Sequence, residues 1–344
     1  MAREVFRGEG TMGAISPRPN ELTAVVDRDL FDEFPAEEGD AADRERWRGF
    51  VRDYASAQEL AEPSAFPLQV DFELTSSCNM KCSFCTHGHE LVPRRLLPFA
   101  DFARVIDEGR EHGLCSIKLN YINEPLLTRD LPRYIRYARD RGVLNVYFAT
   151  NGTMLDGAMA GSLLDAGVSK VMVSLDATTP GTFREVRRSE HFGRIVSNVV
   201  ALIRLRDERG LRFPLVRVNF LKTGLNAHEA EDFLARWRGV ADMVGYQEQV
   251  GVPGVDGPLH IGEDTHAGRE GFRCAFPFKL VVVDSSGLIL PCCTFGGREM
   301  PIGDLENDTI ASAWQGGPMR SLRRLHLEGR YADNPVCRHC IDGT

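Results

Sequence analysis

The sequence predicts an α/β fold: an open, partial (β/α)6 barrel followed by a small C-terminal domain that combines a β-hairpin with helices. Three observations predict it. From Leu68 onward, short β-rich runs alternate with longer amphipathic segments. Within the runs, polar and apolar residues alternate. After about residue 250, this pattern gives way to a Gly- and Pro-rich stretch and a hairpin.

Residues 1–66 are predicted to be an acidic N-terminal extension with one docking helix. Asp40 is a suitable N-cap for that helix. Four apolar residues follow at helical spacing: Trp47, Phe50, Val51 and Tyr54. We expect this stripe to pack on the main body. The extension shows no alternating strand pattern, and its helix is interpreted as a covering or capping helix; covering the open side of the barrel and shaping the substrate pocket are the roles left open.

Residues 67–250 are predicted to form the barrel, because repeated strand–helix units of this length give a parallel sheet with right-handed crossovers. Strands are expected at 68–74, 115–121, 143–149, 170–176, 214–221 and 241–247. Helices are expected at 99–112, 129–141, 154–166, 192–209 and 227–238.

One face of these strands is polar, which is unusual for parallel strands that are buried on both faces. The polar positions are Gln69, Asp71, Glu73, Lys118, Asn120, Lys170, Ser174, Asp176, Arg217 and Asn219. A closed eight-stranded barrel would instead be filled by branched apolar side chains. The polar inner face therefore predicts a partial, TIM-like barrel around a wet ligand cavity.

Composition and charge limit the possible partners. The 344 residues are 43% hydrophobic, which is enough for a full core, and the net charge is −8. Residues 1–66 carry 15 acidic and 8 basic side chains, and no large basic face is expected for nucleic acid. No membrane-length apolar stretch and no signal-peptide pattern are present, so we expect a cytoplasmic protein without a membrane partner.

The nine cysteines indicate metal binding, because a disulfide framework would not persist in a reducing compartment. Cys78, Cys82 and Cys85 follow the first strand with the spacing C-x3-C-x2-C. Three thiolates on a tight loop can hold three irons of a four-iron cluster and leave the fourth iron open to a small molecule. A three-cysteine zinc site is the alternative.

This loop, followed by six strand–helix units, resembles the radical S-adenosylmethionine (radical SAM) superfamily over about residues 68–250. The resemblance implies that the three cysteines bind a [4Fe–4S] cluster and that SAM chelates its open iron. Asn123-Glu124-Pro125 stands where the family usually has Gly-Gly-Glu-Pro, so one glycine is replaced. The residues that the resemblance assigns to SAM binding are Phe84, Asn123, Glu124, Asn151, Ser174 and Asp176.

Residues 251–344 contain a second cysteine set: Cys274, Cys292, Cys337 and Cys340. Four thiolates in a compact fold suit either a structural zinc or a fully ligated iron–sulfur cluster. The set, with a glycine five residues before Cys292 and a tryptophan-bearing helix, resembles the short Twitch form of the SPASM domain. Within the family, the pattern is closest to the 2-deoxy-scyllo-inosamine dehydrogenase of the butirosin pathway. The resemblance implies one auxiliary [4Fe–4S] cluster held by these four residues.

Two cysteines remain outside both sets. Cys115 opens the second strand and is expected to be a small core residue. Cys293 follows a cluster ligand and could be a spare thiol, an alternative ligand or a hydrogen-atom donor. We interpret both as inert and regard Cys293 as the one to test.

The resemblance implies that a 5′-deoxyadenosyl radical removes hydrogen from a polar small molecule, with electrons supplied by a reductase such as flavodoxin or ferredoxin. The first hypothesis is oxidation of a carbinol to a ketone on a sugar, aminocyclitol or related natural product, with the auxiliary cluster taking an electron. Epimerisation or decarboxylation is the redox-neutral alternative, and maturation of a ribosomal peptide ranks lower. A zinc-stabilised binding module is the non-enzymatic alternative. The candidate catalytic residues are Arg217, Asn219, Glu248 and Cys293.

Overall fold

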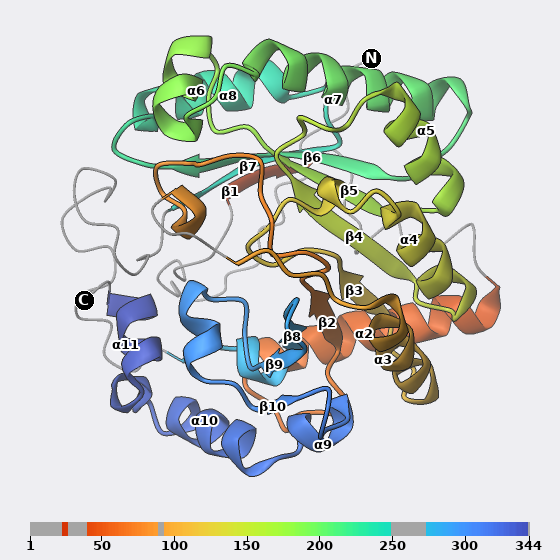
Figure 1. Ribbon diagram of the computed structural model, residues 1–344, viewed down its shortest axis with the longest axis vertical. Coiled ribbons are helices and arrows are strands. Elements are labelled where there is room, and N and C mark those ends of the chain that lie inside the picture. Colours follow the sequence, from red (N-terminus) through yellow and green to blue (C-terminus); the bar gives the residue numbers. More distant parts are fainter. Residues whose placement is uncertain (1–22, 27–39, 89–92, 249–272, 343–344) are drawn as a thin grey trace, which may run out of the picture.

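A computed structural model describes residues 23–26, 40–88, 93–248 and 273–342 of the chain. Its strands form a single ten-stranded sheet in the order β1-β7-β6-β5-β4-β3-β2-β8-β9-β10. Figure 1 shows helices α3–α8 on the outer side of this curved sheet and α9–α11 gathered beside β8–β10. The predicted boundary near residue 250 falls outside the described residues.

The six predicted parallel strands are present and pair in sequence order. They are β2 (Gln69–Phe72), β3 (Ser116–Lys118), β4 (Asn145–Thr150), β5 (Lys170–Ser174), β6 (Leu215–Lys222) and β7 (Met243–Glu248). The predicted helices are α3 (Phe99–Glu111), α4 (Leu131–Asp140), α5 (Gly157–Ala166), α7 (Phe192–Glu208) and α8 (Ala230–Trp237). The partial (β/α)6 barrel is therefore confirmed.

Alternation along the strands divides the barrel into an apolar outer layer and a polar inner face. Val70 and Phe72 are fully buried in the core against the helices. Gln69 and Asp71 turn the other way and hydrogen-bond to each other, and Lys118 lies 3.9 Å from the Asp71 carboxylate. Because successive side chains in a strand point to opposite faces, the polar positions gather inside the barrel.

The predicted N-terminal helix is α2 (Ala41–Gln58), and the Asp40 side chain caps it by accepting from the backbone N–H groups of residues 42 and 43. Trp47 and Phe50 pack on three residues at the amino ends of strands: Cys115, Leu144 and Leu215. The helix therefore closes the amino-terminal end of the barrel. The expectation that its apolar stripe packs on the main body is confirmed.

Two short elements were not predicted. Within residues 1–66, β1 (Thr23–Val26) pairs antiparallel with β7, although the extension shows no alternating strand pattern. α6 (Pro180–Arg187) lies between β5 and α7, with Thr179 as its N-cap and a proline at its first position.

The C-terminal domain adds the predicted hairpin to the barrel sheet. β8 (Leu280–Val283) pairs parallel with β2, and β9 (Leu288–Leu290) pairs antiparallel with β8 and with β10 (Gly303–Asp304). The helices that follow are α9 (Ile310–Trp314), α10 (Gly317–Leu327) and α11 (Pro335–Asp342). Glu73 N–H donates to the Val283 carbonyl just beyond the paired strands. The two cysteine-bearing regions are thus parts of one continuous sheet.

The described helices include none that is both long enough and apolar enough to cross a membrane.

Candidate active site

The loop after β2 carries Cys78, Cys82 and Cys85 along one wall of a cavity of about 340 Å³, which we call the central cavity. Ser83 holds the loop against α6, because both its N–H and its hydroxyl donate to the Val186 carbonyl. The N–H of Glu124, beyond β3, donates to the carbonyl of Ser77. The loop is therefore fixed from two sides at the carboxyl ends of the strands.

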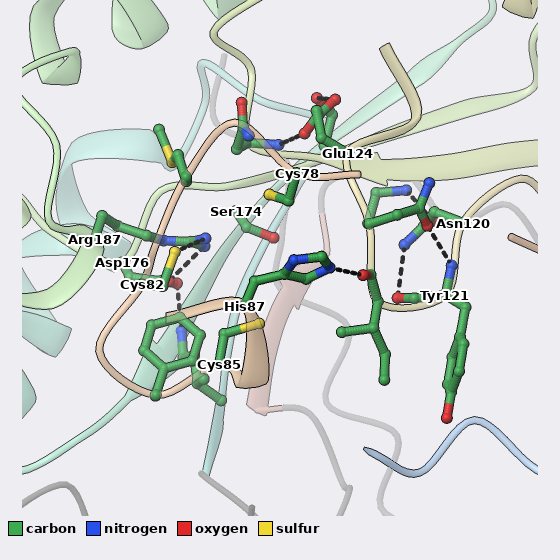
Figure 2. Close-up of a pocket in the computed structure, with 18 of the residues that line it drawn as sticks. Cys78, Cys82, Cys85, His87, Asn120, Tyr121, Glu124, Ser174, Asp176 and Arg187 are labelled. Carbon is green, nitrogen blue, oxygen red and sulfur yellow. Dashed lines mark hydrogen bonds and ion pairs between the residues drawn. The ribbon is translucent and has the colours of Figure 1, made fainter. Parts of the chain in front are cut away.

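The structure brings eleven of the predicted site residues to the central cavity. They are the three loop cysteines, Phe84, Asn123, Glu124, Asn151, Ser174, Asp176, Asn219 and Cys293. Figure 2 shows side chains from several strand ends converging on the loop. Sequence positions more than 200 residues apart thus contribute to one site.

Glu124 is fully buried at the cavity wall, and three donors fix its carboxylate. Thr150 Oγ1 donates at 2.6 Å, Asn151 N at 2.7 Å and Leu126 N at 3.0 Å. Burial raises the pKa of Glu124 to about 6, although the three donors oppose the shift. Its side chain therefore orders the ends of β3 and β4 around the cavity.

Arg187, the last residue of α6, links the cysteine loop to β5. Its guanidinium forms an ion pair with Asp176 at 2.5 Å, donates to Cys82 Sγ at 3.4 Å and lies 5.2 Å from the centre of the Phe84 ring (Figure 2). Burial raises the pKa of Asp176, and the guanidinium opposes that shift. Asp176 also accepts from Leu221 N at 2.7 Å, so this pair ties α6, β5 and β6 together.

The predicted catalytic residues separate into two groups. Asn219 is 7% exposed, is paired in register with Ser174, and its Oδ1 has no hydrogen-bond partner among the described residues. Arg217 lies two residues earlier on the same strand and is not among the residues that line the central cavity. Glu248 ends β7, but its side chain lies outside the described residues.

Cys293 lines the central cavity, whereas Cys115 does not. Cys115 is 6% exposed in the cluster under α2, so the expectation of a small core residue is confirmed. Cys293 is half-buried, and desolvation raises the pKa of its thiol to about 11. Because Cys293 follows Cys292 in the sequence, the C-terminal domain contributes a residue to the wall of the central cavity.

The second cysteine set lies in the C-terminal domain, where its members come from a loop, the β9 end and α11. Burial raises the pKa of Cys274 and of Cys337 to about 12, and the neighbouring thiol of Cys340 adds to both shifts. A buried, crowded set of thiols ionises only when a metal centre compensates the charge. The donor set of Cys274, Cys292, Cys337 and Cys340 therefore fits a tetrathiolate-bound cluster.

Within the described residues, no three Cys, His, Asp or Glu side chains converge closely enough to ligate a single metal ion. In a [4Fe–4S] cluster, each thiolate binds a different iron, so its ligands need not converge on one point. The three loop cysteines, which line a shared cavity wall, fit the SAM-binding cluster in the same way.

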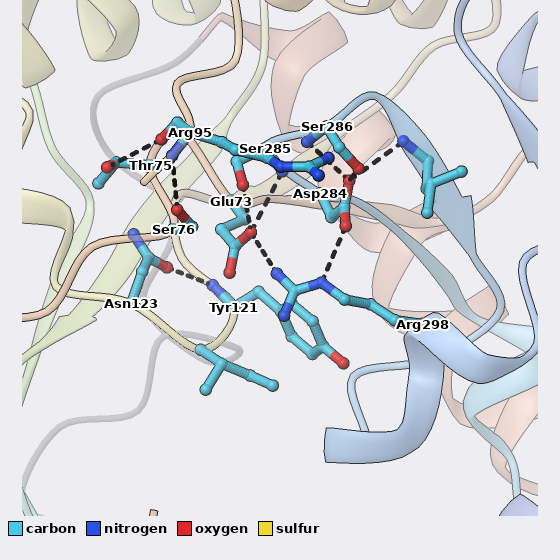
Figure 3. Close-up of polar contacts among 12 residues, drawn as sticks. Glu73, Thr75, Ser76, Arg95, Tyr121, Asn123, Asp284, Ser285, Ser286 and Arg298 are labelled. Carbon is cyan, nitrogen blue, oxygen red and sulfur yellow. Dashed lines mark hydrogen bonds and ion pairs between the residues drawn. The ribbon is translucent and has the colours of Figure 1, made fainter. Parts of the chain in front are cut away.

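A polar contact network joins the barrel to the loop that carries Cys292 and Cys293 (Figure 3). Arg298, in the 3-10 turn Phe295–Glu299, contacts Glu73 at 2.5 Å and Asp284 at 2.9 Å. The Tyr121 hydroxyl donates to the carbonyl of Thr294. We call Glu73, Asp284 and Arg298 the interdomain clamp.

Sequence reasoning missed several residues of the central cavity, chiefly His87, Tyr121 and Arg187. His87 Nε2 lies 2.7 Å from the Ile122 carbonyl oxygen, which orients its ring. The Thr-Pro pair at 179–180 was a sequence signal for α6, and therefore for Arg187 at its end. No local signal marks Tyr121, because its partner, Thr294, is 173 residues away.

Two parts of the chain match known family models. Residues 72–235 match the family model described as the Radical SAM superfamily, and residues 274–341 match SPASM, described as an iron–sulfur cluster-binding domain. The chain therefore contains a radical SAM domain followed by a C-terminal SPASM domain. These domains bind S-adenosylmethionine and two [4Fe–4S] clusters.

The curated relatives include a probable GTP 3′,8-cyclase of Metallosphaera sedula, 29% identical over 205 residues, which are 58% of this chain and 59% of that protein. Another, from Sulfolobus acidocaldarius, is 35% identical over 161 residues, or 47% of this chain and 49% of that protein. The chain thus spans about half the length of the curated relatives it matches.

Two solved structures share the fold. BtrN in complex with AdoMet and 2-DOIA is 17% identical, with a TM-score of 0.52 over 81% of this chain and 94% of that chain. Native anSMEcpe with bound AdoMet is 13% identical, with a TM-score of 0.57 over 76% of this chain and 84% of that chain. At these sequence identities, the comparison shows a shared fold and nothing about activity.

Proposed function

We propose that this protein oxidises a carbinol of a polar small molecule, such as a sugar or an aminocyclitol, to a ketone. The observation that carries the proposal is the shared wall of the central cavity. The three loop cysteines line it together with Cys293, the neighbour of Cys292. A substrate in this cavity would therefore lie between the SAM-binding site and the auxiliary-cluster loop.

The oxidation removes two electrons and two protons from the substrate. The hydrogen of the carbinol C–H leaves with one electron, the O–H proton passes to a base, and the second electron leaves toward the C-terminal domain. When bound, SAM and the first cluster supply the hydrogen-abstracting oxidant, and the auxiliary cluster supplies the electron acceptor. An external reductase such as flavodoxin or ferredoxin would supply the electron that starts each turnover.

The chain's own residues would bind and orient the substrate. Asn219 offers a buried Oδ1 without a partner among the described residues, which suits a substrate hydroxyl donor. Ser174, its register partner, is assigned to SAM, so Asn219 would lie where SAM and the substrate meet. Glu248 ends the neighbouring strand β7, but it pairs in register with Lys222, on the strand face opposite to Asn219 and Leu221, so the base is left unassigned.

Charge favours a neutral or weakly charged substrate. Among the described residues that line the central cavity, Arg187 is the one guanidinium or ammonium group, and Asp176 already pairs with it. Much of the remaining polar lining is amide or hydroxyl; Asn123, Asn151 and Ser174 are assigned to SAM, which leaves the amides of Asn120 and Asn219 for a substrate. Such a lining suits a polyhydroxylated molecule better than a triphosphate.

The curated relatives support a second candidate, rearrangement of a purine nucleotide, because their names describe GTP 3′,8-cyclases. This candidate would require phosphate-binding cations from residues outside the described lining. Redox-neutral epimerisation is a third candidate, and the position of Cys293 on the cavity wall supports it. Decarboxylation loses its proposed anchor, because Arg217 is not among the lining residues.

The test is a substrate panel of aminocyclitols, sugars and GTP, incubated anaerobically with reconstituted protein, SAM and dithionite. We expect one aminocyclitol or sugar to lose two mass units, with one 5′-deoxyadenosine formed per product. Deuterium on its carbinol carbon should appear in 5′-deoxyadenosine. Consumption of GTP alone would favour the cyclase. A product whose mass is unchanged in H2O but one unit higher in D2O would favour epimerisation.

The Asn219→Ala and Cys293→Ala variants separate the proposed roles. Under the oxidation proposal, Asn219→Ala raises the KM for the substrate by up to about tenfold, because one hydrogen bond to a substrate hydroxyl is lost. Cys293→Ala leaves ketone formation within a few-fold of wild type. A Cys293→Ala variant that still cleaves SAM but forms no product would contradict oxidation and favour epimerisation.

A further inference from the structure

His326 lies between two members of the second cysteine set. It occupies the last turn of α10 and is 1% exposed. Its Nδ1 lies 3.2 Å from the backbone nitrogen of Cys274, and its Nε2 lies 3.6 Å from Sγ of Cys337. One imidazole ring therefore connects two cysteines that are 63 positions apart in the sequence.

These contacts fix the tautomer of the ring. The backbone N–H of Cys274 can only donate, so Nδ1 must accept and carries no hydrogen. A neutral imidazole with a bare Nδ1 carries its hydrogen on Nε2. The N–H bond on Nε2 then faces the sulfur of Cys337, within the range of an N–H···S hydrogen bond.

We propose that His326 is a positioning residue of the auxiliary cluster, which donates its Nε2 hydrogen to the Cys337 sulfur and holds the Cys274 backbone in place. Hydrogen bonds to cluster sulfurs are among the factors that set reduction potential, because they stabilise the more negative, reduced state. The ring would therefore make the auxiliary cluster a better electron acceptor. This inference depends on the cluster site and not on the identity of the substrate.

Two substitutions test the two hydrogen bonds of the His326 ring separately. In His326→Asn, the amide oxygen can take the place of Nδ1 and accept from Cys274, but no donor reaches Cys337. In His326→Gln, the longer amide places an N–H near the former Nε2. His112→Asn is the matched control, because His112 stacks on Phe66 with 4.7 Å between ring centres and is not among the residues lining the central cavity.

The experiment is an EPR-monitored redox titration of the full-length, reconstituted chain with Cys78, Cys82 and Cys85 replaced by alanine, so that only the auxiliary cluster contributes. We expect His326→Asn to lower the reduction potential of the auxiliary cluster by up to about 59 mV. For one electron, this corresponds to a tenfold change in the reduction equilibrium constant. His326→Gln and His112→Asn should stay close to the parent chain.

An unchanged potential in His326→Asn with full iron content would overturn the proposal, as would equal shifts in the Asn and Gln variants. A second measurement covers the case in which the Asn variant loses its cluster. Pulsed EPR of the reduced parent chain, labelled with ¹⁵N-histidine, should show a weak coupling typical of a hydrogen bond. A strong coupling from a nitrogen bound directly to iron would make His326 a ligand and contradict the proposed role.

Discussion

Arg187 is the residue at which the cysteine loop, α6 and β5 meet. Its guanidinium and the Asp176 carboxylate are both nearly inaccessible, at 9% and 1% side-chain exposure. Taking two charges out of water costs free energy, which their mutual attraction and hydrogen bonds must offset. Removing one partner should therefore cost more than removing both.

We predict that Arg187→Met lowers the free energy of unfolding by about 3–5 kcal/mol, because Asp176 is left as a buried charge without its partner. Denaturant unfolding of the apoprotein measures this loss. The double variant Arg187→Met/Asp176→Asn should recover part of it. Equal stability of Arg187→Met and wild type would show that the ion pair contributes nothing.

Asp71 makes stability depend on pH. Burial raises its pKa to about 6, while Lys118 and the amide of Gln69 oppose the shift. The folded carboxyl then holds its proton at a pH where the unfolded one has lost it. Its contribution to stability is therefore complete below about pH 4, falls as pH rises, and is lost above about pH 6.

We predict that the unfolding free energy of wild type falls relative to that of Asp71→Asn by about 1 kcal/mol between pH 5 and pH 7. Parallel denaturant titrations of the two proteins at each pH measure this difference, and groups common to both cancel. A difference that stays constant, or that changes in the opposite direction, would contradict a raised pKa for Asp71.

At the residue scale, the sequence predicted the members of the cavity better than the contacts between them. The loop cysteines, Glu124 and Asp176 were predicted from local motifs at the strand ends, and all line the cavity. Arg187 was missed because the helix that places it was not predicted. His326 gave no signal, because only the folded chain brings it between Cys274 and Cys337.

At the scale of single elements, α2 contributes to stability at the end of the barrel away from the central cavity. Trp47 and Phe50 are 3% and 6% exposed against the amino ends of the strands. We predict that Trp47→Ala lowers the unfolding free energy by about 3–5 kcal/mol, the usual cost of truncating a buried aromatic side chain.

Arg48→Ala, an exposed site on the same helix, is the control and should change stability by less than about 0.5 kcal/mol. Thermal or denaturant unfolding measures both variants. A Trp47→Ala loss no larger than that of Arg48→Ala would show that α2 does not help to hold the barrel closed.

Elements with strong periodicity were predictable, and short elements stabilised by distant partners were not. The α4 segment carries apolar residues at 131, 134, 135 and 138, all buried, and its helix was expected. β1 has only four residues, and its partner β7 is about 220 positions away, so only long-range pairing stabilises it. The α6 helix has only eight residues and begins with a proline, so its apolar periodicity is too short to predict a helix.

At the scale of the whole molecule, the interdomain clamp fixes the auxiliary-cluster loop to the barrel. Glu73 is fully buried and accepts from Ser285 Oγ at 2.7 Å as well as from Arg298. Arg298 also lies 5.3 Å from the centre of the Tyr121 ring (Figure 3). The relative position of the two cysteine sets therefore depends on this contact.

We predict that Arg298→Met lowers the unfolding free energy by about 3 kcal/mol, because Glu73 is left buried without its cation, and that it broadens the EPR signal of the auxiliary cluster. Arg298→Lys should restore part of the stability but not the double contact, since a single ammonium cannot reproduce the fork of a guanidinium. An unchanged spectrum and stability in Arg298→Met would show that the clamp does not position the loop.

The overall architecture followed from the strand–helix repeat, but the continuity of the sheet did not. The hairpin was expected in a separate small domain, whereas β8 extends the barrel sheet beside β2. Pairing between segments about 210 positions apart has no local signature. This continuity brings Cys293 to the cavity of the loop cysteines.

Iron content per chain, determined together with SAM cleavage, tests most directly whether two separate cysteine sets hold two clusters. We predict about eight irons in the reconstituted wild type, and about four when Cys274, Cys292, Cys337 and Cys340 are replaced by alanine. Both proteins should form 5′-deoxyadenosine with dithionite, because the first cluster alone supports cleavage. A single tetrathiolate zinc in the wild type, without SAM cleavage, would contradict the two-cluster site and the function proposed from it.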